Sequence, residues 1–279
     1  MDAQVCPMER MERLLVATDW SESSRSAVEE AIQLAKACSS KLIAMTTVLT
    51  NLEYEDAMPW VIERAEKEMQ EKLESIRRMA SEQGIECETF VYRGDDPSMD
   101  IVNAAVMKHV DMIVMGTRGR TGLKKLIMGS VTGNVIGHAP CKVLVVPPGA
   151  KTDYRTILIA TDGSIHSAAA ASEAAAIAKR YGSALVVVSV AFSTAEVPSA
   201  EENVKQVMEL AEREGLKKEG LVLQGKPHEV ILEIAKQKHV GLIVVGSHGR
   251  TGLTSLFMGS VTERVISLTE SAVLVVKAS

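Results

Sequence analysis

Two segments with the same glycine spacing are the part of this sequence best suited to binding an anion. Residues 116–130 and residues 246–260 both read Gly-x2-Gly-x9-Gly-Ser. Glycine lets backbone N–H groups come close to phosphate oxygens, because no Cβ atom stands between them. The serine that closes each segment is expected to begin a helix, where unpaired N–H groups and the positive dipole end favour a negative charge. The spacing therefore predicts two phosphate-binding segments, although a Gly-Ser pair at a helix start is also a common cap.

An aspartate stands near the start of each half in an equivalent position. Asp19 follows the apolar run at residues 14–17, and Asp162 follows the run at residues 157–160. A serine comes two residues after each aspartate, which is typical of a capped turn between a strand and a helix. The two interpretations, capping and ligand contact, both stand, and one carboxylate can serve in both.

These matching residues belong to an internal duplication. Residues 108–132 and 238–262 are identical at 17 of 25 aligned positions. The separation between matching residues falls from 143 at the start of the repeat to 130 near its end, so the second copy is 13 residues shorter. The loss is expected in a charged helical stretch that covers residues 55–83 in copy one and residues 200–214 in copy two.

Both copies alternate short apolar runs with helical segments. Unbroken apolar runs are typical of strands buried on both faces, and they cover residues 14–17, 42–48, 112–115 and 143–146, then 157–160, 185–190, 242–245 and 273–276. We expect five strands and four helices per copy, in an α/β fold with a mostly parallel sheet and helices on both faces. The expected units are a flexible tail at residues 1–10, domain one at 11–147, a linker at 148–153 and domain two at 154–279.

The composition argues against several other classes of protein. A net charge of -5 disfavours nucleic acid or an anionic membrane as a partner. No apolar run reaches the length of a membrane span, and the N-terminal residues lack an apolar signal core, so a cytoplasmic location is expected. The four cysteines show neither a Cys-x-x-Cys pair nor regular spacing, so we expect reduced, buried thiols rather than a metal site or a disulfide: Cys6, Cys38, Cys87 and Cys141.

The glycine pattern, together with the aspartate after the first strand, resembles the nucleotide-binding signature of the universal stress protein family, and the likeness extends over both copies. The resemblance implies an adenine nucleotide alpha hydrolase-like fold, with two tandem open parallel five-stranded sheets in the order 3-2-1-4-5. It also implies one adenine nucleotide per copy at the carboxyl edge of the strands, ATP or AMP, and it leaves ADP and a Mg²⁺ ion with ATP open.

The resemblance further implies which residues hold the nucleotide. In each copy the aspartate would lie near the adenosine, a valine at the end of the second strand would pack on the adenine, and the glycine segment would hold ribose and phosphates. The implied residues are Thr18, Asp19, Val48, Met115, Gly116, Arg118, Gly119, Gly129, Ser130, Val131 and Thr132 in copy one, and Thr161, Asp162, Val190, Val245, Gly246, His248, Gly249, Gly259, Ser260, Val261 and Thr262 in copy two.

The two predicted sites carry different charge. More fixed positive charge favours more phosphate groups, so our hypothesis is that site one prefers a triphosphate and site two discriminates less. Solvated surface loops without any ligand preference are the alternative. The positions that differ are Arg118, Lys124 and Lys125 in copy one and His248, Thr254 and Ser255 in copy two.

Three classes of function are compatible with these features. The first is a binding module of the stress response that reports nucleotide state to an unidentified regulatory protein. The second is a slow ATPase or phosphotransferase, although no general base stands out. The third is a nucleotide-independent, chaperone-like dimerisation protein. Since members of the family commonly dimerise through their last strands, we expect the copies to form a pair within the chain through residues 142–146 and 272–276, and a homodimer of chains stays open.

Overall fold

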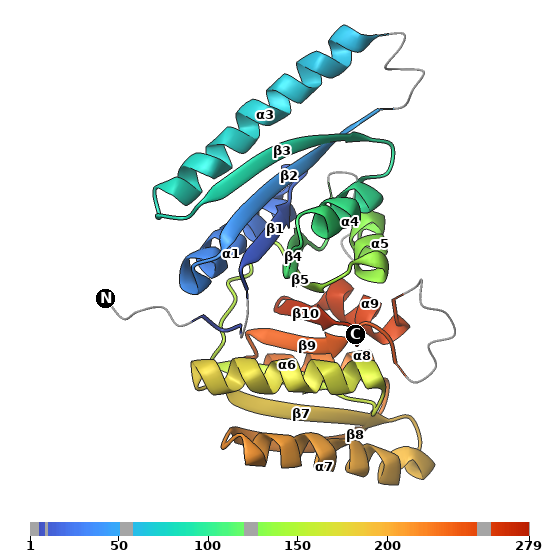
Figure 1. Cartoon of the computed structure of the whole chain (residues 1–279). Coiled ribbons are helices and arrows are strands. Elements are labelled where there is room, and N and C mark those ends of the chain that lie inside the picture. The colour runs from blue at the N-terminus through green and yellow to red at the C-terminus, as the bar shows by residue number, and fades with distance from the viewer. Residues whose placement is uncertain (1–5, 9–10, 51–57, 120–127, 250–257, 279) are drawn as a thin grey trace.

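The computed structural model describes residues 6–8, 11–50, 58–119, 128–249 and 258–278. Their strands form one ten-stranded sheet in the order β3-β2-β1-β4-β5-β10-β9-β6-β7-β8 (Figure 1). Read from its outer edge, each half has the order 3-2-1-4-5, and its strands are parallel. The predicted fold class and strand order are confirmed, and the two expected sheets are joined edge to edge.

The described residues contain five strands and four α-helices in each repeat, as predicted. Repeat one comprises β1 (Arg13–Ala17), α1 (Glu22–Cys38), β2 (Lys41–Leu49), α3 (Pro59–Ser81), β3 (Cys87–Gly94), α4 (Pro97–Met107), β4 (Met112–Gly116), α5 (Ser130–His138) and β5 (Lys142–Val146). Repeat two comprises β6 (Thr156–Ala160), α6 (Ile165–Tyr181), β7 (Ala184–Ala191), the short 3-10 helix η1 (Thr194–Glu196), α7 (Val197–Arg213), β8 (Lys217–Gln224), α8 (Pro227–Gln237), β9 (Leu242–Gly246), α9 (Ser260–Leu268) and β10 (Ala272–Val276). Part of the expected shortening falls on α7, which has 17 residues where α3 has 23.

Helices cover both faces of the sheet, and apolar strand residues fill the space beneath them. One buried cluster contains side chains of α1, α3, α6 and α7, and the other contains side chains of α4, α5, α8 and α9. Because successive strand residues point to opposite faces, Leu14 and Val16 of β1 belong to the first cluster, and Leu15 and Ala17 belong to the second. No helix in the described part of the chain is long and apolar enough to cross a membrane.

Strands β5 and β10 join the two repeats. They pair antiparallel, with Leu144 opposite Leu274, so each last strand supplies hydrogen-bond partners to an edge of the other repeat. On one side of this junction Lys142 forms an ion pair with Glu173 of α6 at 2.5 Å, and the two side chains are 15% and 22% exposed. The junction therefore combines backbone pairing with a mostly buried pair of charges.

The N-terminal residues and two of the cysteines differ from expectation. Cys6 and Cys38 form a disulfide, and Met8 is 1% exposed, so residues 6–8 pack against repeat one and are not part of a flexible tail. The expectation of reduced thiols is wrong for these two cysteines, since a separation of 32 residues conceals that the N-terminal segment returns to the end of α1. Cys87 and Cys141 are free thiols, as expected.

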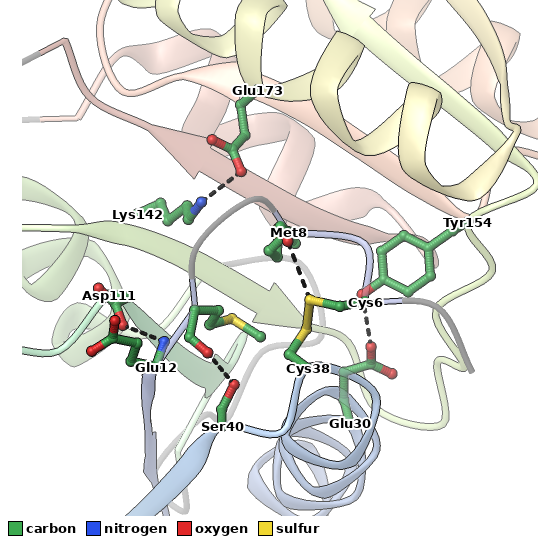
Figure 2. The surroundings of a disulfide bond; sticks show 11 residues. Cys6, Met8, Glu12, Glu30, Cys38, Ser40, Asp111, Lys142, Tyr154 and Glu173 are labelled. Atoms are coloured by element: carbon green, nitrogen blue, oxygen red, sulfur yellow. Dashed lines mark hydrogen bonds and ion pairs between the residues drawn. A yellow bond between two sulfur atoms is a disulfide. The ribbon is translucent and has the colours of Figure 1, made fainter. Parts of the chain in front are cut away.

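Figure 2 shows the disulfide beside the junction of the repeats. Tyr154, which precedes β6, donates its hydroxyl to the carboxylate of Glu30 in α1 at 3.2 Å. Burial is the main cause that raises the pKa of Glu30. The disulfide and this hydrogen bond therefore attach the N-terminal segment and the start of repeat two to the same helix.

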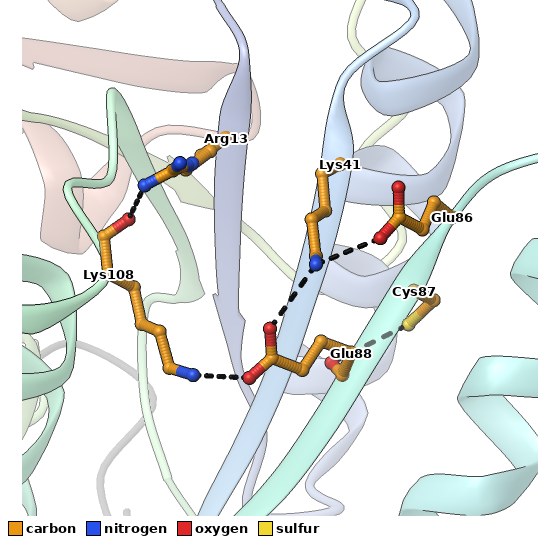
Figure 3. Close-up of polar contacts among 6 residues, drawn as sticks. All are labelled: Arg13, Lys41, Glu86, Cys87, Glu88 and Lys108. Atoms are coloured by element: carbon orange, nitrogen blue, oxygen red, sulfur yellow. Dashed lines mark hydrogen bonds and ion pairs between the residues drawn. The ribbon is translucent and has the colours of Figure 1, made fainter.

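Ion pairs connect the outer strand β3 to its neighbours. Figure 3 shows Glu88 of β3 between Lys41 of β2 and Lys108, which follows α4. Lys41 also pairs with Glu86 at 2.9 Å. These side chains are substantially exposed, so solvent screens each pair and it contributes little to stability.

Candidate functional site

The aspartate after the first strand and the second glycine of each signature meet at the carboxyl edge of the sheet. A Cβ atom placed on Gly119 would lie 2.7 Å from Oδ2 of Asp19, and one placed on Gly249 would lie 2.7 Å from Oδ2 of Asp162. Parallel strands bring their carboxyl ends to one edge, which explains how residues so far apart in the sequence come together. The structure thus unites the two parts of each site that the sequence analysis singled out.

Each aspartate also stabilises the turn that follows it. Oδ1 of Asp19 accepts a hydrogen bond from the N–H of Ser21 at 3.1 Å, and Oδ1 of Asp162 accepts one from Ser164 at 3.0 Å. Ser21 in turn caps α1 by accepting the N–H of Ser24 at 3.2 Å. One oxygen of each aspartate therefore holds the turn before the helix, whose N-cap is the serine, Ser21 or Ser164, while the other oxygen lies against the glycine segment.

The glycines of each signature are required for different reasons. A Cβ atom on Gly116 would lie 2.7 Å from the carbonyl carbon of Ser23, so the first glycine is needed for close packing of β4 against α1. The nearest atoms to a Cβ on Gly129 or Gly259 would be 3.3 and 3.5 Å away. Both of these glycines are N-caps with extended backbone, and no side chain in the described part of the chain caps α5 or α9. Helix N-termini of this kind favour an anion.

The residues after the last glycine divide into exposed and buried positions. Ser130 and Ser260 are exposed at the first helical position, and Val131 and Val261 are half-buried. Thr132 is buried and donates its hydroxyl to the carbonyl of Gly116 at 3.0 Å, and Thr262 donates to Gly246 at 2.9 Å. These threonines therefore hold the first helical turn against the end of the strand.

Four further residues of the predicted set lie beneath the edge. Thr18 and Thr161 are buried, and each hydroxyl is hydrogen-bonded to a serine of the following helix, at 3.1 and 3.2 Å. Met115 and Val245, the penultimate residues of β4 and β9, are also buried. Both belong to the buried cluster beneath this edge of the sheet.

The two valines expected on the adenine are not equivalent. Strands β2 and β7 pair with β1 and β6 in the same register, at an offset of 143 residues. Val190 therefore corresponds to Thr47, and Val48 corresponds to Ala191. Since neighbouring strand residues point to opposite faces, Val48 and Val190 cannot both contact the same part of an equivalent ligand. The sequence did not reveal this one-residue shift, because both runs carry a valine near their end.

A buried carboxylate that the sequence analysis missed lies next to Thr47. Asp100, in the first turn of α4, is buried, and burial raises its pKa while a hydrogen bond with Thr47 lowers it. One of its oxygens lies 2.5 Å from the position that a Cβ on Gly94 would take. Val230 stands at the equivalent place in α8. Repeat one thus has polar groups where repeat two is apolar, and the available signal was an aspartate within an otherwise apolar helical pattern.

The residues at the third position of each signature face inward or across the junction. Nη2 of Arg118 donates to the carbonyl of Ser267 in α9 at 3.1 Å. His248 is 8% exposed, lies 3.0 Å from the hydroxyl of Ser247 through Nδ1, and has its ring centroid 5.2 Å from that of His166. Burial and then the neighbouring His248 lower the pKa of His166. The other positions of the charge hypothesis lie outside the described residues: Lys124, Lys125, Thr254 and Ser255.

No cluster of metal-binding side chains marks the site among the described residues. They include no group of three His, Cys, Asp or Glu side chains that could hold a metal ion. Two hollows of about 540 and 640 Å³ lie elsewhere, along α3 and beside Cys38. The convergence of the aspartate, the glycines and the helix N-terminus defines the candidate site.

Comparison with known proteins agrees with the duplicated architecture. The model of the universal stress protein family matches residues 11–147 and again residues 153–277. A universal stress protein of Mycolicibacterium smegmatis is 28% identical in an alignment of 288 positions that covers 95% of this chain and 96% of the relative. One from Methanocaldococcus jannaschii is 36% identical over 138 residues, covering 48% of this chain and 81% of the relative. The crystal structure of a universal stress protein from Archaeoglobus fulgidus superposes with a TM-score of 0.79 at 24% identity, covering 96% of this chain and 98% of that one. The chain belongs to the universal stress protein family and carries two copies of its domain in tandem.

Proposed function

We propose that each repeat binds one adenine nucleotide, ATP or AMP, at the carboxyl edge of its strands, and that the protein is a regulatory binding module of the stress response. The observation that carries the proposal is the arrangement common to both repeats. Asp19 or Asp162 lies against the second glycine, beside a helix N-terminus that no described side chain caps. A carboxylate can accept hydrogen bonds from ribose hydroxyls or a base, and a helix N-terminus favours phosphate.

The proposed ligand follows the edge from β2 to α5 in repeat one and from β7 to α9 in repeat two. Its phosphates would lie at the exposed Ser130 and Ser260, the first residues of α5 and α9. The base would lie near Thr47 and Val190, which the strand register makes equivalent. ADP fits the same groups, and a Mg²⁺ ion would be held by the phosphates and water, as is common for this ion.

The pairing of β5 with β10 supports a second part of the proposal. The two repeats would act as an intramolecular pair, in place of the dimer that the resemblance attributes to members of this family. Light scattering after size exclusion tests this: a monomer of 30.1 kDa agrees with it, and twice that mass indicates a homodimer of chains. A cytoplasmic location and an unidentified regulatory protein partner belong to the same proposal, although the Cys6–Cys38 disulfide removes the argument from reduced cysteines.

Nucleotide retained during purification provides the direct test. The protein is purified without added nucleotide and denatured, and the released molecules are identified by mass spectrometry. We expect about two adenine nucleotides per chain, because each repeat has one helix N-terminus at its proposed phosphate position. Gly129→Val and Gly259→Val each place a side chain over the N–H groups of one helix, and each is expected to retain one nucleotide. Ser172→Ala, on the exposed face of α6, is the control.

Two outcomes would contradict the proposal. The first is the absence of nucleotide from the purified protein together with no thermal shift when ATP is added, because a ligand that binds the native state must stabilise it. The second is hydrolysis of ATP. If the wild type with Mg²⁺ releases phosphate from ATP well above the rate of the Gly129→Val, Gly259→Val double variant, a slow ATPase is favoured instead.

A further inference from the structure

Ser267 belongs to the helix that begins at site two, yet it contacts site one. Helix α9 starts with Ser260 at the proposed phosphate position of repeat two. The carbonyl of Ser267 accepts a hydrogen bond from Nη2 of Arg118 at 3.1 Å, and its hydroxyl accepts one from the N–H of Met128 at 3.1 Å. Arg118 and Met128 stand on either side of residues 120–127 in the first glycine segment. One residue of repeat two therefore contacts both described ends of this segment.

The direction of the Ser267 hydroxyl is set within its own helix. The hydroxyl donates its proton to the carbonyl of Glu263 at 2.8 Å. Its oxygen is then an acceptor only, and the N–H of Met128 is the donor that it meets. Since Met128 directly precedes Gly129, the N-cap of α5, this contact adjoins the phosphate-binding turn of site one.

We propose that Ser267 couples the two nucleotide sites, so that a nucleotide at site two strengthens binding at site one. This inference rests on the proposed function. Helix α9 has nine residues, and a helix of that length spans roughly 13 Å and moves as a unit. A ligand held on its first turn restrains the position of Ser267, and Ser267 restrains Arg118 and Met128. Groups that are already ordered cost less to fix when the second ligand arrives, and the coupling must be equal in both directions.

The opposite repeat makes a different contact at the equivalent place. The counterpart of Ser267 in α5 is Gly137, which has no hydroxyl. Its carbonyl accepts a hydrogen bond from Nζ of Lys277 at 2.7 Å, and Lys277 also reaches the carbonyl of Ala139 at 3.0 Å. The C-terminal ends of α5 and α9 are thus each hydrogen-bonded to the other repeat. Of these two ends, only that of α9 contacts described residues of a glycine segment through a side-chain hydroxyl, that of Ser267. A substitution of Ser267 therefore tests this contact and leaves the contacts of Lys277 unchanged.

Site one contains its own spectroscopic reporter. The chain has two tryptophans, Trp20 and Trp60, and both lie in repeat one. Trp20 directly follows Asp19, and its indole Nε1 is buried without a hydrogen-bond partner among the described residues. Trp60 is 65% exposed on α3, and Trp60→Phe removes its signal. In that background the fluorescence of Trp20 is expected to report nucleotide binding at site one.

The experiment measures the Kd of site one twice, once in a protein whose site two is intact and once in a protein whose site two is blocked. ATP is titrated into the Trp60→Phe protein, freed of retained nucleotide, and into the same nucleotide-free protein with Gly259→Val. We expect the Kd of site one to rise about fivefold or more when site two is closed, in the usual range of coupling between sites. In Ser267→Ala the two titrations are expected to agree within about twofold, the level at which coupling is negligible. Ser267→Thr keeps the hydroxyl and is expected to restore the difference.

The control removes a serine of the same local geometry. The hydroxyl of Ser172 in α6 also donates to the carbonyl four residues earlier, that of Ala168, and Ser172→Ala is expected to keep the full difference. Hydrogen exchange at the amide of Met128 gives an independent measurement in a chain with both sites intact. ATP is expected to slow this exchange more in the wild type than in Ser267→Ala.

The outcomes separate this inference from the proposed function. Two sites that bind ATP independently in the wild type, or a difference that survives in Ser267→Ala, would overturn the coupling and leave nucleotide binding intact. The absence of ATP binding at both sites would overturn the coupling together with the proposed function.

Discussion

Loss of the Cys6–Cys38 disulfide is expected to destabilise repeat one. The bridge joins residues separated by 32 positions and closes a loop that contains β1 and nearly all of α1. A cross-link of this kind acts mainly on the unfolded chain, whose conformational entropy it reduces. For a loop of this length the entropy relation predicts a loss of about 3.7 kcal/mol in the free energy of unfolding at 25 °C when the bridge is removed.

The loss depends on whether the N-terminal segment stays in place. Met8 is 1% exposed, and burial of a methionine side chain contributes about 1.5–3 kcal/mol. If residues 6–8 remain packed after reduction, only the entropic contribution of the disulfide is lost. If they detach, the burial of Met8 is lost as well, and the total approaches about 6 kcal/mol.

Urea unfolding under three conditions measures this loss. The oxidised wild type, the wild type with dithiothreitol and Cys6→Ser are compared by circular dichroism, and free thiols are counted in each. The oxidised protein is expected to have two free thiols, Cys87 and Cys141. Dithiothreitol is expected to leave the stability of Cys6→Ser unchanged, which controls for its other effects. Four free thiols in protein purified without reductant, or a Cys6→Ser variant within about 1 kcal/mol of the wild type, would refute the reasoning.

Three further outcomes are expected. Burial raises the pKa of Glu30 above its ordinary value of 4.5, so its stabilising contribution is fully present below pH 4.5 and is lost as the pH rises through the raised pKa. Glu30→Gln should remove this decline, and an unchanged pH profile in urea unfolding would contradict it. Gly116→Ala should lower the free energy of unfolding by about 1–3 kcal/mol, because its Cβ would lie 2.7 Å from a backbone carbon of α1. Gly259→Ala should fold normally, and equal melting temperatures of the two variants would count against this prediction. Burial raises the pKa of Cys87 to about 11 and that of Cys141 to about 12, so both should resist iodoacetamide at neutral pH, and rapid labelling detected by mass spectrometry would disprove it.

The features that the sequence predicted correctly are those encoded locally. Unbroken apolar runs such as residues 14–17 and 242–245 indicate strands buried on both faces, and the structure has β1 and β9 there. The alternation of such runs with helical segments is enough to indicate a parallel sheet, because parallel strands need crossover connections. The positions of Asp19 and Asp162 and of the glycines indicated residues that the structure brings together, since they follow strand ends that must meet at one edge.

The features that the sequence did not predict depend on contacts between distant segments. The equivalence of Thr47 with Val190 is set by backbone pairing between strands, and a shift of one residue moves a side chain to the other face. The buried position of Asp100 depends on the packing of α4 beside Gly94, and composition does not reveal it.

The sequence alone therefore determined the duplication and the fold class, and it indicated candidate groups for binding a nucleotide. The tertiary structure decided which of these groups touch, and it added contacts with no local signal: the disulfide between Cys6 and Cys38, and the hydrogen bonds that link Ser267 to Arg118 and Met128. The physical reason is that propensity and periodicity act over a few neighbouring residues. Bonds between residues far apart in the chain exist only after the helices and strands have packed together.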